Sequence, residues 1–194
     1  RGNGDERVLL FFSYGLGSIP FGLILTKLFL NQDIREVGSK NIGATNVLRT
    51  GNKFIAGLTL LLDIFKGVIP VIVTNYYFPD LIYLSGLMAL LGHIFPLWLK
   101  FKGGKGVSTY LGIIFALSLK LGLFFCITWI ILAFISKYSS FSSIVSVLVI
   151  FFISLLEINL ELNLFLFTVF VIILYTHKQN IVRLKNKTED KIKL

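Results

Sequence analysis

The chain contains few of the residues that build disulfide frameworks and metal centres. Its 194 residues include one cysteine, Cys126, and two histidines. A single cysteine cannot form an intrachain disulfide, and Cys126 lies inside an apolar run, which predicts a buried structural thiol. The two histidines are far apart and the carboxylates are scattered, so no spacing typical of metal ligands is present. We therefore expect neither a metal nor a cofactor.

A soluble domain, a low-complexity stretch and an internal repeat are also missing. Hydrophobic residues instead make up 55% of the chain, and the mean hydropathy is +0.83. This exceeds what a soluble domain of this length needs to fill its core. The composition predicts an all-α integral membrane protein, in which the chemistry falls to loops and helix ends.

Apolar runs predict seven transmembrane helices. They cover residues 8–30, 54–76, 81–99, 107–119, 121–135, 142–156 and 162–176. Several of these runs are short for a hydrocarbon core of about 30 Å. Fusing 107–135 into one helix would give a length of about 44 Å, which is too long to fit the membrane without severe tilt. Lys120 and Gly122 mark that break. Fusing the last two runs would bury Glu157 and Glu161 in the middle of the membrane, so we expect a break there as well.

Acidic residues are scarce, with 10 against 19 basic residues and a formal net charge of +9. With seven spans, nearly all lysines and arginines beside the spans fall on one side, which predicts that this side is cytoplasmic. The N-terminus then lies outside and the C-terminus lies in the cytoplasm. Removing one span would place the basic tail outside, so the charges favour seven spans, with five as the alternative. We interpret the charge as a topogenic signal that also attracts anionic membrane lipids, and we expect no nucleic acid partner. Residues 8–183 are predicted to form a single domain, with flexible termini at 1–7 and 184–194.

A polar, glycine-rich loop separates the first two apolar runs. Residues 38–49 read G-S-K-N-I-G-A-T-N-V-L-R. Glycines allow backbone turns that other residues disfavour, short polar side chains add hydrogen-bond donors, and Arg49 adds a bidentate charge. We predict a phosphate-binding loop whose substrate-binding residues are Gly38, Asn41, Gly43, Thr45 and Asn46, together with Ser39. A flexible linker with positive charge on the cytoplasmic side is the alternative.

A second glycine-rich loop lies within residues 92–109. Gly103, Gly104 and Gly106 surround Lys105, and the helix that follows could place its N-terminal dipole behind an anion. The G-x-x-x-x-G-K-[ST] spacing is absent, so we do not expect nucleotide hydrolysis. Lys105 is the candidate anion ligand, with the three glycines as substrate-binding residues. His93 is interpreted either as a structural hydrogen bonder or as a site residue.

The last apolar run ends in a third polar segment, residues 175–183. On a continuing helix, His177, Asn180 and Arg183 are three apart and share one face. The alternative is an ordinary cluster of basic residues after a span. The loop 137–143 adds several hydroxyl groups, among them Ser140 and Ser143.

Two charges interrupt the second apolar run. Asp63 and Lys66 stand three apart, and each costs roughly 2.5–3.5 kcal/mol at the centre of a membrane. The pair must be neutralised by itself or by a polar cavity. We favour a structural role in which the pair positions the glycine-rich loops, and an ion or proton path through a transporter is the alternative.

These motifs, taken in order, resemble those of the bacterial membrane acyl-phosphate:glycerol-3-phosphate acyltransferases. The shared pattern runs G-S-x-P-x-G, G-S-x-N-I-G-A-T-N-V-x-R, D-x-x-K-G, G-H-x-F-P-x-x-x-x-F-K-G-G-K-G-V, K-Y-x-S and H-x-x-N-I-x-R, from Gly17 to Arg183. The resemblance implies a monomeric, seven-span enzyme of the bacterial inner membrane whose active site faces the cytoplasm. It would move a fatty acyl group from acyl phosphate to the sn-1 hydroxyl of glycerol-3-phosphate, giving lysophosphatidic acid and phosphate in phospholipid biosynthesis.

The resemblance also assigns roles to residues of this chain. Ser39 and its loop neighbours would hold the acyl phosphate, and Arg49 and Lys105 would engage substrate phosphates. His177 and Asn180 would complete the catalytic set, and Ser140 or Ser143 would contact the glycerol phosphate. Lys40 and Ser108 depart from the family pattern, because they stand where Gly and Ala are common.

The acyltransferase signature H-x-x-x-x-D is missing, since Trp98 and Val182 occupy the fifth positions after the two histidines. We therefore expect direct attack of the acceptor hydroxyl on the acyl carbonyl without an acyl-enzyme, with His177 or the donor phosphate accepting the proton. The alternative function is a membrane transporter of phosphate or a phosphorylated metabolite. It is less favoured because the predicted outer loops 76–80 and 157–161 hold no cation to receive an anion.

Overall fold

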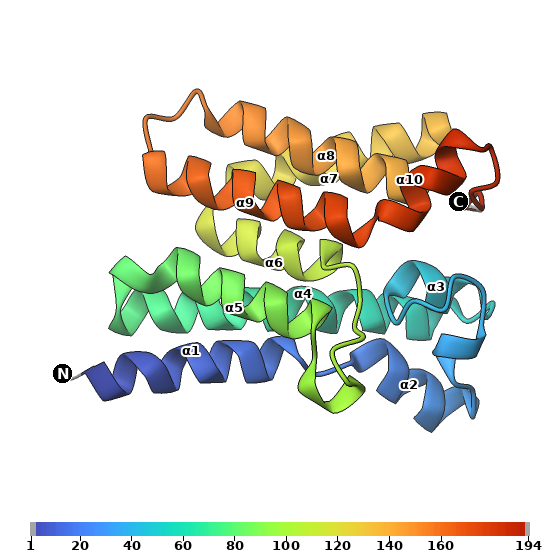
Figure 1. The fold of residues 1–194 in the computed structure, drawn as a ribbon, viewed down its shortest axis with the longest axis horizontal. Helices are drawn as coiled ribbons and strands as arrows, with labels where there is room; N and C mark the ends of the chain where they lie inside the picture. The colour runs from blue at the N-terminus through green and yellow to red at the C-terminus, as the bar shows by residue number, and fades with distance from the viewer. Residues whose placement is uncertain (1–2, 193–194) are drawn as a thin grey trace. The chain divides into compact units, whose positions relative to one another are not determined.

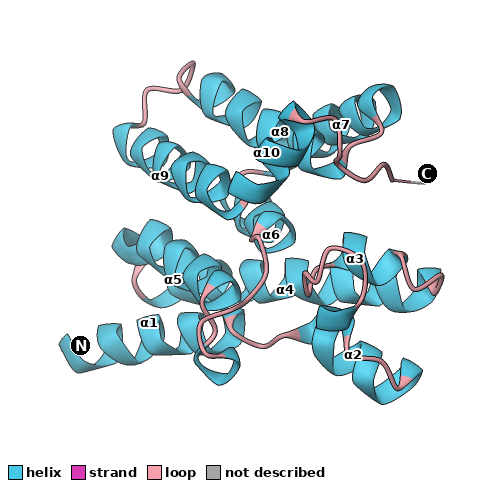
Figure 2. Ribbon diagram, turned by 45° about the vertical axis from the view of Figure 1, so that its right-hand side comes forward, coloured by secondary structure: helices cyan, strands magenta, loops and turns pink. Residues whose placement is uncertain are grey.

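The computed structural model describes residues 3–192, and every regular element in that range is a helix (Figures 1 and 2). The all-α prediction is therefore confirmed. The chain divides into two compact units, Arg1–Leu117 and Ser118–Leu194. The single domain over residues 8–183 stays a prediction.

The first unit is built around one long helix, α4. Its helices are α1 (Asn3–Gly17), α2 (Phe21–Leu30), α3 (Ala44–Leu48), α4 (Lys53–Tyr77), α5 (Ile82–Ile94) and α6 (Val107–Leu117), with short 3-10 helices η1 (Ile34–Glu36), η2 (Pro79–Leu81) and η3 (Leu97–Leu99). Helix α4 packs against all five other α-helices of the unit, and α1 runs alongside α5 (Figure 1). These contacts with five helices fix the position of α4.

Small residues bring these helices into close contact. A Cβ atom at Gly67 of α4 would overlap the carbonyl of Thr109 in α6, and one at Gly112 of α6 would overlap the carbonyl of Ile64 in α4. Helix backbones can approach this closely only where no side chain intervenes. The contact of α4 with α6 therefore depends on these two glycines.

The first predicted span is broken in the structure. Helix α1 ends at Gly17, α2 begins at Phe21, and the two helices are bent by 40°. Pro20 stands at the N-cap of α2, where its missing N–H disturbs no helical hydrogen bond. Residues 1–7 are predicted to form a flexible terminus, whereas α1 begins at Asn3; residues 1 and 2 lie outside the described range.

The second unit contains α7 (Leu119–Ser136), α8 (Ser139–Ser154), α9 (Leu160–Thr176) and α10 (Lys178–Lys185). Helix α8 packs against α7 and α9, and α10 packs against both α8 and α9. Residues 186–192 follow α10 as a tail without helix, while residues 193 and 194, which belong to the predicted flexible terminus, lie outside the described range.

Both predicted breaks between the later apolar runs are confirmed. Ser118 caps α7 by accepting a hydrogen bond from the Leu121 N–H at 3.3 Å, so the break falls at Ser118 and not at Lys120. Between α8 and α9, Asn159 caps α9 by accepting from the Leu162 N–H at 2.9 Å. Glu157 thus lies in the connection between α8 and α9, and Glu161 lies in the first turn of α9, so both are away from the helix centres.

Length and apolar character support membrane insertion. Within residues 3–192, three segments are long and apolar enough to cross a membrane: Lys53–Tyr77, Pro79–Leu99 and Leu119–Ser136. The number rises to five if each of the bent pairs α1–α2 and α9–α10 is one span, and α6 and α8 are shorter apolar helices. The count of seven spans and the sides on which the termini lie stay predictions.

Candidate functional site

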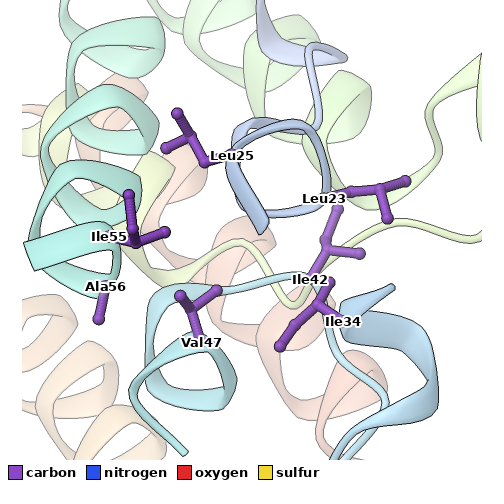
Figure 3. Close-up of a cluster of buried hydrophobic side chains, with 7 residues drawn as sticks. All are labelled: Leu23, Leu25, Ile34, Ile42, Val47, Ile55 and Ala56. Atoms are coloured by element: carbon purple, nitrogen blue, oxygen red, sulfur yellow. The ribbon is translucent and has the colours of Figure 1, made fainter. Parts of the chain in front are cut away.

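The glycine-rich residues 38–49, which we call the cradle loop, rest on a cluster of buried apolar side chains (Figure 3). Ile42 and Val47 of the loop point into this cluster beside Ile34 and Leu23, and each is at most 6% exposed. A Cβ atom at Gly22 of α2 would overlap the carbonyl of Ile42. The buried side chains of Ile42 and Val47, and the close approach of α2 at Gly22, therefore hold the backbone of the cradle loop in place.

Asn46 fixes the shape of the cradle loop. Its Oδ1 accepts a hydrogen bond from the Ser39 N–H at 2.9 Å, and its Nδ2 donates to the carbonyls of Ile34, Val37 and Asn41 at 2.8–3.1 Å. Two amide hydrogens serve three acceptors, and the side chain is 2% exposed. Asn46, predicted to bind substrate, thus holds together the loop that presents the other candidates.

Arg49 lies across Gly38. A Cβ atom at Gly38 would come within 2.9 Å of the Arg49 Cδ and 2.6 Å of the Asn46 Oδ1, and the φ angle of Gly38 is +51°. Both space and backbone conformation therefore require glycine here. Ser39, next in sequence, is exposed, so a cationic side chain and an accessible hydroxyl lie at the same turn.

The other predicted members of the cradle loop lie at the start of α3. Gly43 precedes the helix and donates its N–H to the Asn41 Oδ1 at 2.8 Å, which closes a tight turn. Thr45 lies in the first turn of α3 and is half-buried. The Gly43 N–H is thus used inside the loop, while Asn41 shapes the turn that leads from Ser39 to α3.

The second glycine-rich loop folds back on the end of α5. The N–H groups of Gly103 and Gly104 donate to the carbonyls of Ile94 and His93, both at 3.0 Å. A Cβ atom at Gly104 would overlap the ring of His93. These glycines therefore allow close approach to α5, and half-buried Lys105 is held beside them.

Two further observations complete this loop. Gly106 has a φ angle of +91°, and a Cβ atom there would lie 2.7 Å from the Leu90 Cδ1. Leu99, just before the loop, packs against the apolar cluster under the cradle loop. Leu99 thus connects the segment before the second glycine-rich loop to the apolar cluster that supports the cradle loop.

The buried charges of α4 connect three parts of the first unit. Lys66 Nζ lies 2.8 Å from Asp63 Oδ1, and both side chains are at most 2% exposed. The same Nζ donates to the carbonyl of Ile19 between α1 and α2 at 2.8 Å. His93 Nδ1 lies 3.9 Å from Asp63 Oδ1, beyond hydrogen-bond distance. The ion pair thus joins α4 to the break between α1 and α2, and it lies near His93, whose ring contacts Gly104.

In the second unit, His177 lies between α9 and α10, and the two helices are bent by 62° relative to each other. Its Nδ1 lies 2.9 Å from the carbonyl of Ile173, and the side chain is 2% exposed. A carbonyl can only accept, so Nδ1 carries the hydrogen and Nε2 is the nitrogen able to accept a proton. The fold therefore leaves Nε2 as the nitrogen of His177 that can accept a proton.

Ser140 and Asn180 meet through a residue that the sequence analysis missed, Glu189. The Ser140 Oγ donates to the Glu189 Oε1 at 2.7 Å, the Asn180 Nδ2 donates to the same oxygen at 2.6 Å, and the Arg183 Nε donates to Oε2 at 2.7 Å. Burial raises the pKa of Glu189, but the hydrogen bonds from Ser140, Asn180 and Arg183 outweigh it, so the pKa lies below its ordinary value of 4.5. Glu189 therefore binds these donors as a carboxylate.

Ser143 has a different environment. Its Oγ donates to the carbonyl of Ser139 at 2.8 Å and accepts from the Trp129 Nε1 at 3.0 Å. Ser143 thus connects α7 with α8, whereas Ser140 belongs to the cluster with Asn180. Among residues 3–192, no group of three histidine, cysteine, aspartate or glutamate side chains is placed to hold a metal ion.

Comparison with known proteins covers nearly the whole chain. The glycerol-3-phosphate acyltransferase family profile matches residues 7–187. The glycerol-3-phosphate acyltransferase of Pelagibacter ubique (strain HTCC1062) is 55% identical over 182 residues, which cover 94% of this chain and 95% of that protein. The enzyme of the same name from Brucella anthropi is 48% identical over 184 residues, covering 94% and 91%.

Solved structures agree with this assignment. The crystal structure of PlsY (YgiH), an integral membrane glycerol 3-phosphate acyltransferase, in its glycerol 3-phosphate form matches with a TM-score of 0.92 and 35% identity, covering 96% of this chain and 94% of that one. The lysophosphatidic acid form matches with a TM-score of 0.89 and 34% identity, with the same coverage. The chain is thus an all-α integral membrane protein, and it belongs to the glycerol-3-phosphate acyltransferase family.

Proposed function

We propose that this protein transfers a fatty acyl group from an acyl phosphate to the sn-1 hydroxyl of glycerol-3-phosphate, producing lysophosphatidic acid and phosphate. The observation that carries the proposal is the cradle loop, in which Arg49 lies across Gly38 beside the exposed Ser39. Relatives named glycerol-3-phosphate acyltransferase, and a solved relative in its glycerol 3-phosphate form, support the acceptor.

An acyl phosphate suits this chain as the donor. Phosphate is already a good leaving group, so the acceptor hydroxyl can attack the acyl carbonyl directly while the bond from the carbonyl carbon to the phosphate oxygen breaks. Both substrates are phosphorylated, and the first unit offers a cation in each glycine-rich loop, Arg49 and Lys105. These cations would hold the phosphates and stabilise the negative charge that develops during the reaction.

The proton of the attacking hydroxyl needs an acceptor. His177 is suited to this role because its Nδ1–H donates to Ile173, which leaves Nε2 as the basic nitrogen. The donor phosphate is the other acceptor with the required chemistry, since its oxygens gain negative charge as it leaves. Asn180, three residues further along the chain in α10, would help to orient glycerol-3-phosphate.

We place the reaction at the cytoplasmic face of the bacterial inner membrane, in a monomer. The basic loops support this side. In a Cys126→Ala background, a membrane-impermeant thiol reagent should label Ile158→Cys in intact cells and Lys40→Cys only after permeabilisation. Both positions are exposed in the structure. Labelling of Lys40→Cys in intact cells would contradict this orientation.

The donor is tested by direct comparison. The purified protein is given glycerol-3-phosphate with either palmitoyl phosphate or palmitoyl-CoA, and the position of the acyl chain in the product is determined by NMR. We expect 1-palmitoyl lysophosphatidic acid from palmitoyl phosphate. The rate with palmitoyl-CoA should be lower by about 100-fold or more. Equal or faster use of palmitoyl-CoA would refute the donor, and a 2-acyl product would refute the position.

A further inference from the structure

The connection between α5 and α6 contains a turn that combines large apolar side chains with lysines. Residues 97–102, which we call the 97–102 turn, read L-W-L-K-F-K. Three of its apolar side chains are more than half exposed: Leu97 at 57%, Trp98 at 61% and Phe101 at 56%. Its two lysines, Lys100 and Lys102, are exposed as well. So much exposed apolar area in one short turn indicates a surface that contacts more than water.

The 97–102 turn lies at the end of a segment that is long and apolar enough to cross a membrane, Pro79–Leu99. Figure 1 shows the connection between α5 and α6, in bright green, as a loop beside the α1–α2 break. Lysine is costly inside the hydrocarbon, whereas tryptophan is enriched where the hydrocarbon meets the lipid headgroups. The mixture of side chains therefore fits the membrane–water interface better than it fits either hydrocarbon or water.

Two consecutive residues of this turn adopt a left-handed backbone conformation. The φ angle is +53° at Lys100 and +62° at Phe101, although neither residue is glycine. Side chains disfavour this conformation, so the surrounding structure must hold it. The Phe101 N–H donates to the carbonyl of Pro96 at 2.9 Å, and the Lys102 N–H donates to the carbonyl of Leu99 at 3.1 Å. The turn is therefore a fixed surface and not a flexible connection.

Trp98 is attached to the α1–α2 break. Its Nε1–H donates to the carbonyl of Ser18 at 2.9 Å. Just before the turn, the carbonyl of Phe95 accepts a hydrogen bond from the Tyr14 hydroxyl at 2.7 Å. The polar atom of the indole is thus used inside the protein, and the exposed part of the ring is apolar. These two contacts hold the ring and the base of the turn in fixed positions.

Among residues 3–192, no carboxylate forms an ion pair with Lys100 or Lys102. We propose that the 97–102 turn binds an anionic phospholipid of the surrounding membrane. Trp98 and Phe101 insert at the level of the headgroups, and the two lysines contact the lipid phosphate. An anionic lipid fits best because it lacks the headgroup cation that neutralises the phosphate of a zwitterionic lipid. Lipid binding here does not depend on the acyl transfer proposed above.

The test uses Trp98 as its own reporter. The chain contains two tryptophans, so Trp129→Phe leaves the fluorescence of Trp98 alone. This protein is reconstituted into phosphatidylcholine bilayers with increasing fractions of either phosphatidylcholine or phosphatidylglycerol that carries bromine on its acyl chains. Bromine quenches a nearby indole, so the two quenching curves give the affinity of phosphatidylglycerol relative to phosphatidylcholine at Trp98.

The lysines are tested in the same Trp129→Phe background. Lys100→Asn keeps a residue that tolerates the left-handed conformation, and it is combined with Lys102→Gln in a double variant. Lys53→Gln, which removes an exposed lysine at the start of α4, is the matched control. A further measurement in about 1 M salt, where the Debye length is about 3 Å, needs no lysine variant and tests the charges even if the double variant folds poorly.

We expect both brominated lipids to quench Trp98, with phosphatidylglycerol preferred by about tenfold or more. Each single lysine variant should lower this preference by about fivefold, because one cation near the lipid surface is lost. The double variant should bind the two lipids equally, and high salt should lower the preference of the protein that retains both lysines. Lys53→Gln should keep the full preference.

Three results would overturn the inference. If neither brominated lipid quenches Trp98, the turn faces water, and its apolar residues belong to a contact with another protein. If the two lipids bind equally before any lysine is changed, the ring reaches the membrane but no anionic lipid is selected. If the preference survives in the double variant, or falls by the same factor in Lys53→Gln, the two lysines of the turn are not the ligands of the phosphate.

Discussion

Asp63 and Lys66 form an ion pair of 2.8 Å inside α4, with both side chains almost completely buried. Lys66 also donates to the carbonyl of Ile19, so one ammonium group neutralises a carboxylate and satisfies the backbone at the α1–α2 break. A buried ion pair is tolerated only while both partners are present, since either one alone is an uncompensated charge.

Removing one member of this pair should cost far more than removing both. We expect Asp63→Leu or Lys66→Met alone to lower the free energy of unfolding by about 3–5 kcal/mol. The double variant should be more stable than either single variant. Thermal unfolding of the purified proteins in detergent measures the effect. Additive losses in the double variant would show that the two charges do not depend on each other.

The contact between Gly104 and His93 leads to a rescue experiment. Gly104→Ala should reduce activity by about tenfold or more, because its Cβ would overlap the His93 ring and displace the loop that carries Lys105. Adding His93→Ala removes the obstacle and should restore most of the loss, as measured by initial rates of acyl transfer.

Gly103→Ala is the matched control for this rescue. A Cβ atom at Gly103 would overlap the backbone carbonyl of His93, which no side-chain truncation removes. His93→Ala should therefore fail to rescue Gly103→Ala. If His93→Ala alone abolishes activity in a protein of normal stability, His93 belongs to the catalytic set and the structural interpretation is wrong.

The proton acceptor can be identified by removing His177. If the histidine is the base, His177→Ala should lower kcat by about 100-fold or more with little change in KM for the donor. The comparison with His177→Asn separates loss of the base from loss of the hydrogen bond to Ile173. Activity of His177→Ala near that of the wild type would assign the proton to the donor phosphate.

Protonation of Glu189 should weaken the second unit in acid. The pKa of Glu189 is lower in the folded protein than its ordinary value of 4.5, so the carboxylate contributes stability above pH 4.5. This contribution is lost as the pH falls from 4.5 through the folded pKa. The difference in melting temperature between wild type and Glu189→Gln should thus be largest near neutral pH and shrink below pH 4.5. A difference that stays constant across this range would contradict the role of the charged form.

The sequence predicts the long helices well because their apolar runs are continuous. The run 54–76 becomes α4 over Lys53–Tyr77, and the breaks before α7 and α9 coincide with capping residues. The first span differs from its prediction, because a long apolar run does not show that Pro20 starts a separate helix. Lys40 has a φ angle of +61°, a conformation that glycine adopts more readily than lysine, which agrees with the glycine that the family resemblance leads one to expect there.

The candidate site was harder to predict where it depends on contacts between distant residues. Residues that share one loop, such as Gly38 and Arg49, are brought together as their spacing suggests. Glu189 lies 49 residues from Ser140, in a basic tail that resembles a cytoplasmic terminus by composition. Only the folded tail shows that this carboxylate connects two predicted site residues.

Release of phosphate from palmitoyl phosphate, with and without glycerol-3-phosphate, tests the central claim most directly. We expect release to require the acceptor, to match the amount of lysophosphatidic acid formed, and to fall by about 100-fold or more in Arg49→Ala and Lys105→Ala, because each variant loses a charge-assisted contact to a phosphate. Release that does not depend on glycerol-3-phosphate, or a protein that is inactive with every acyl donor but carries phosphate into liposomes, would contradict the account.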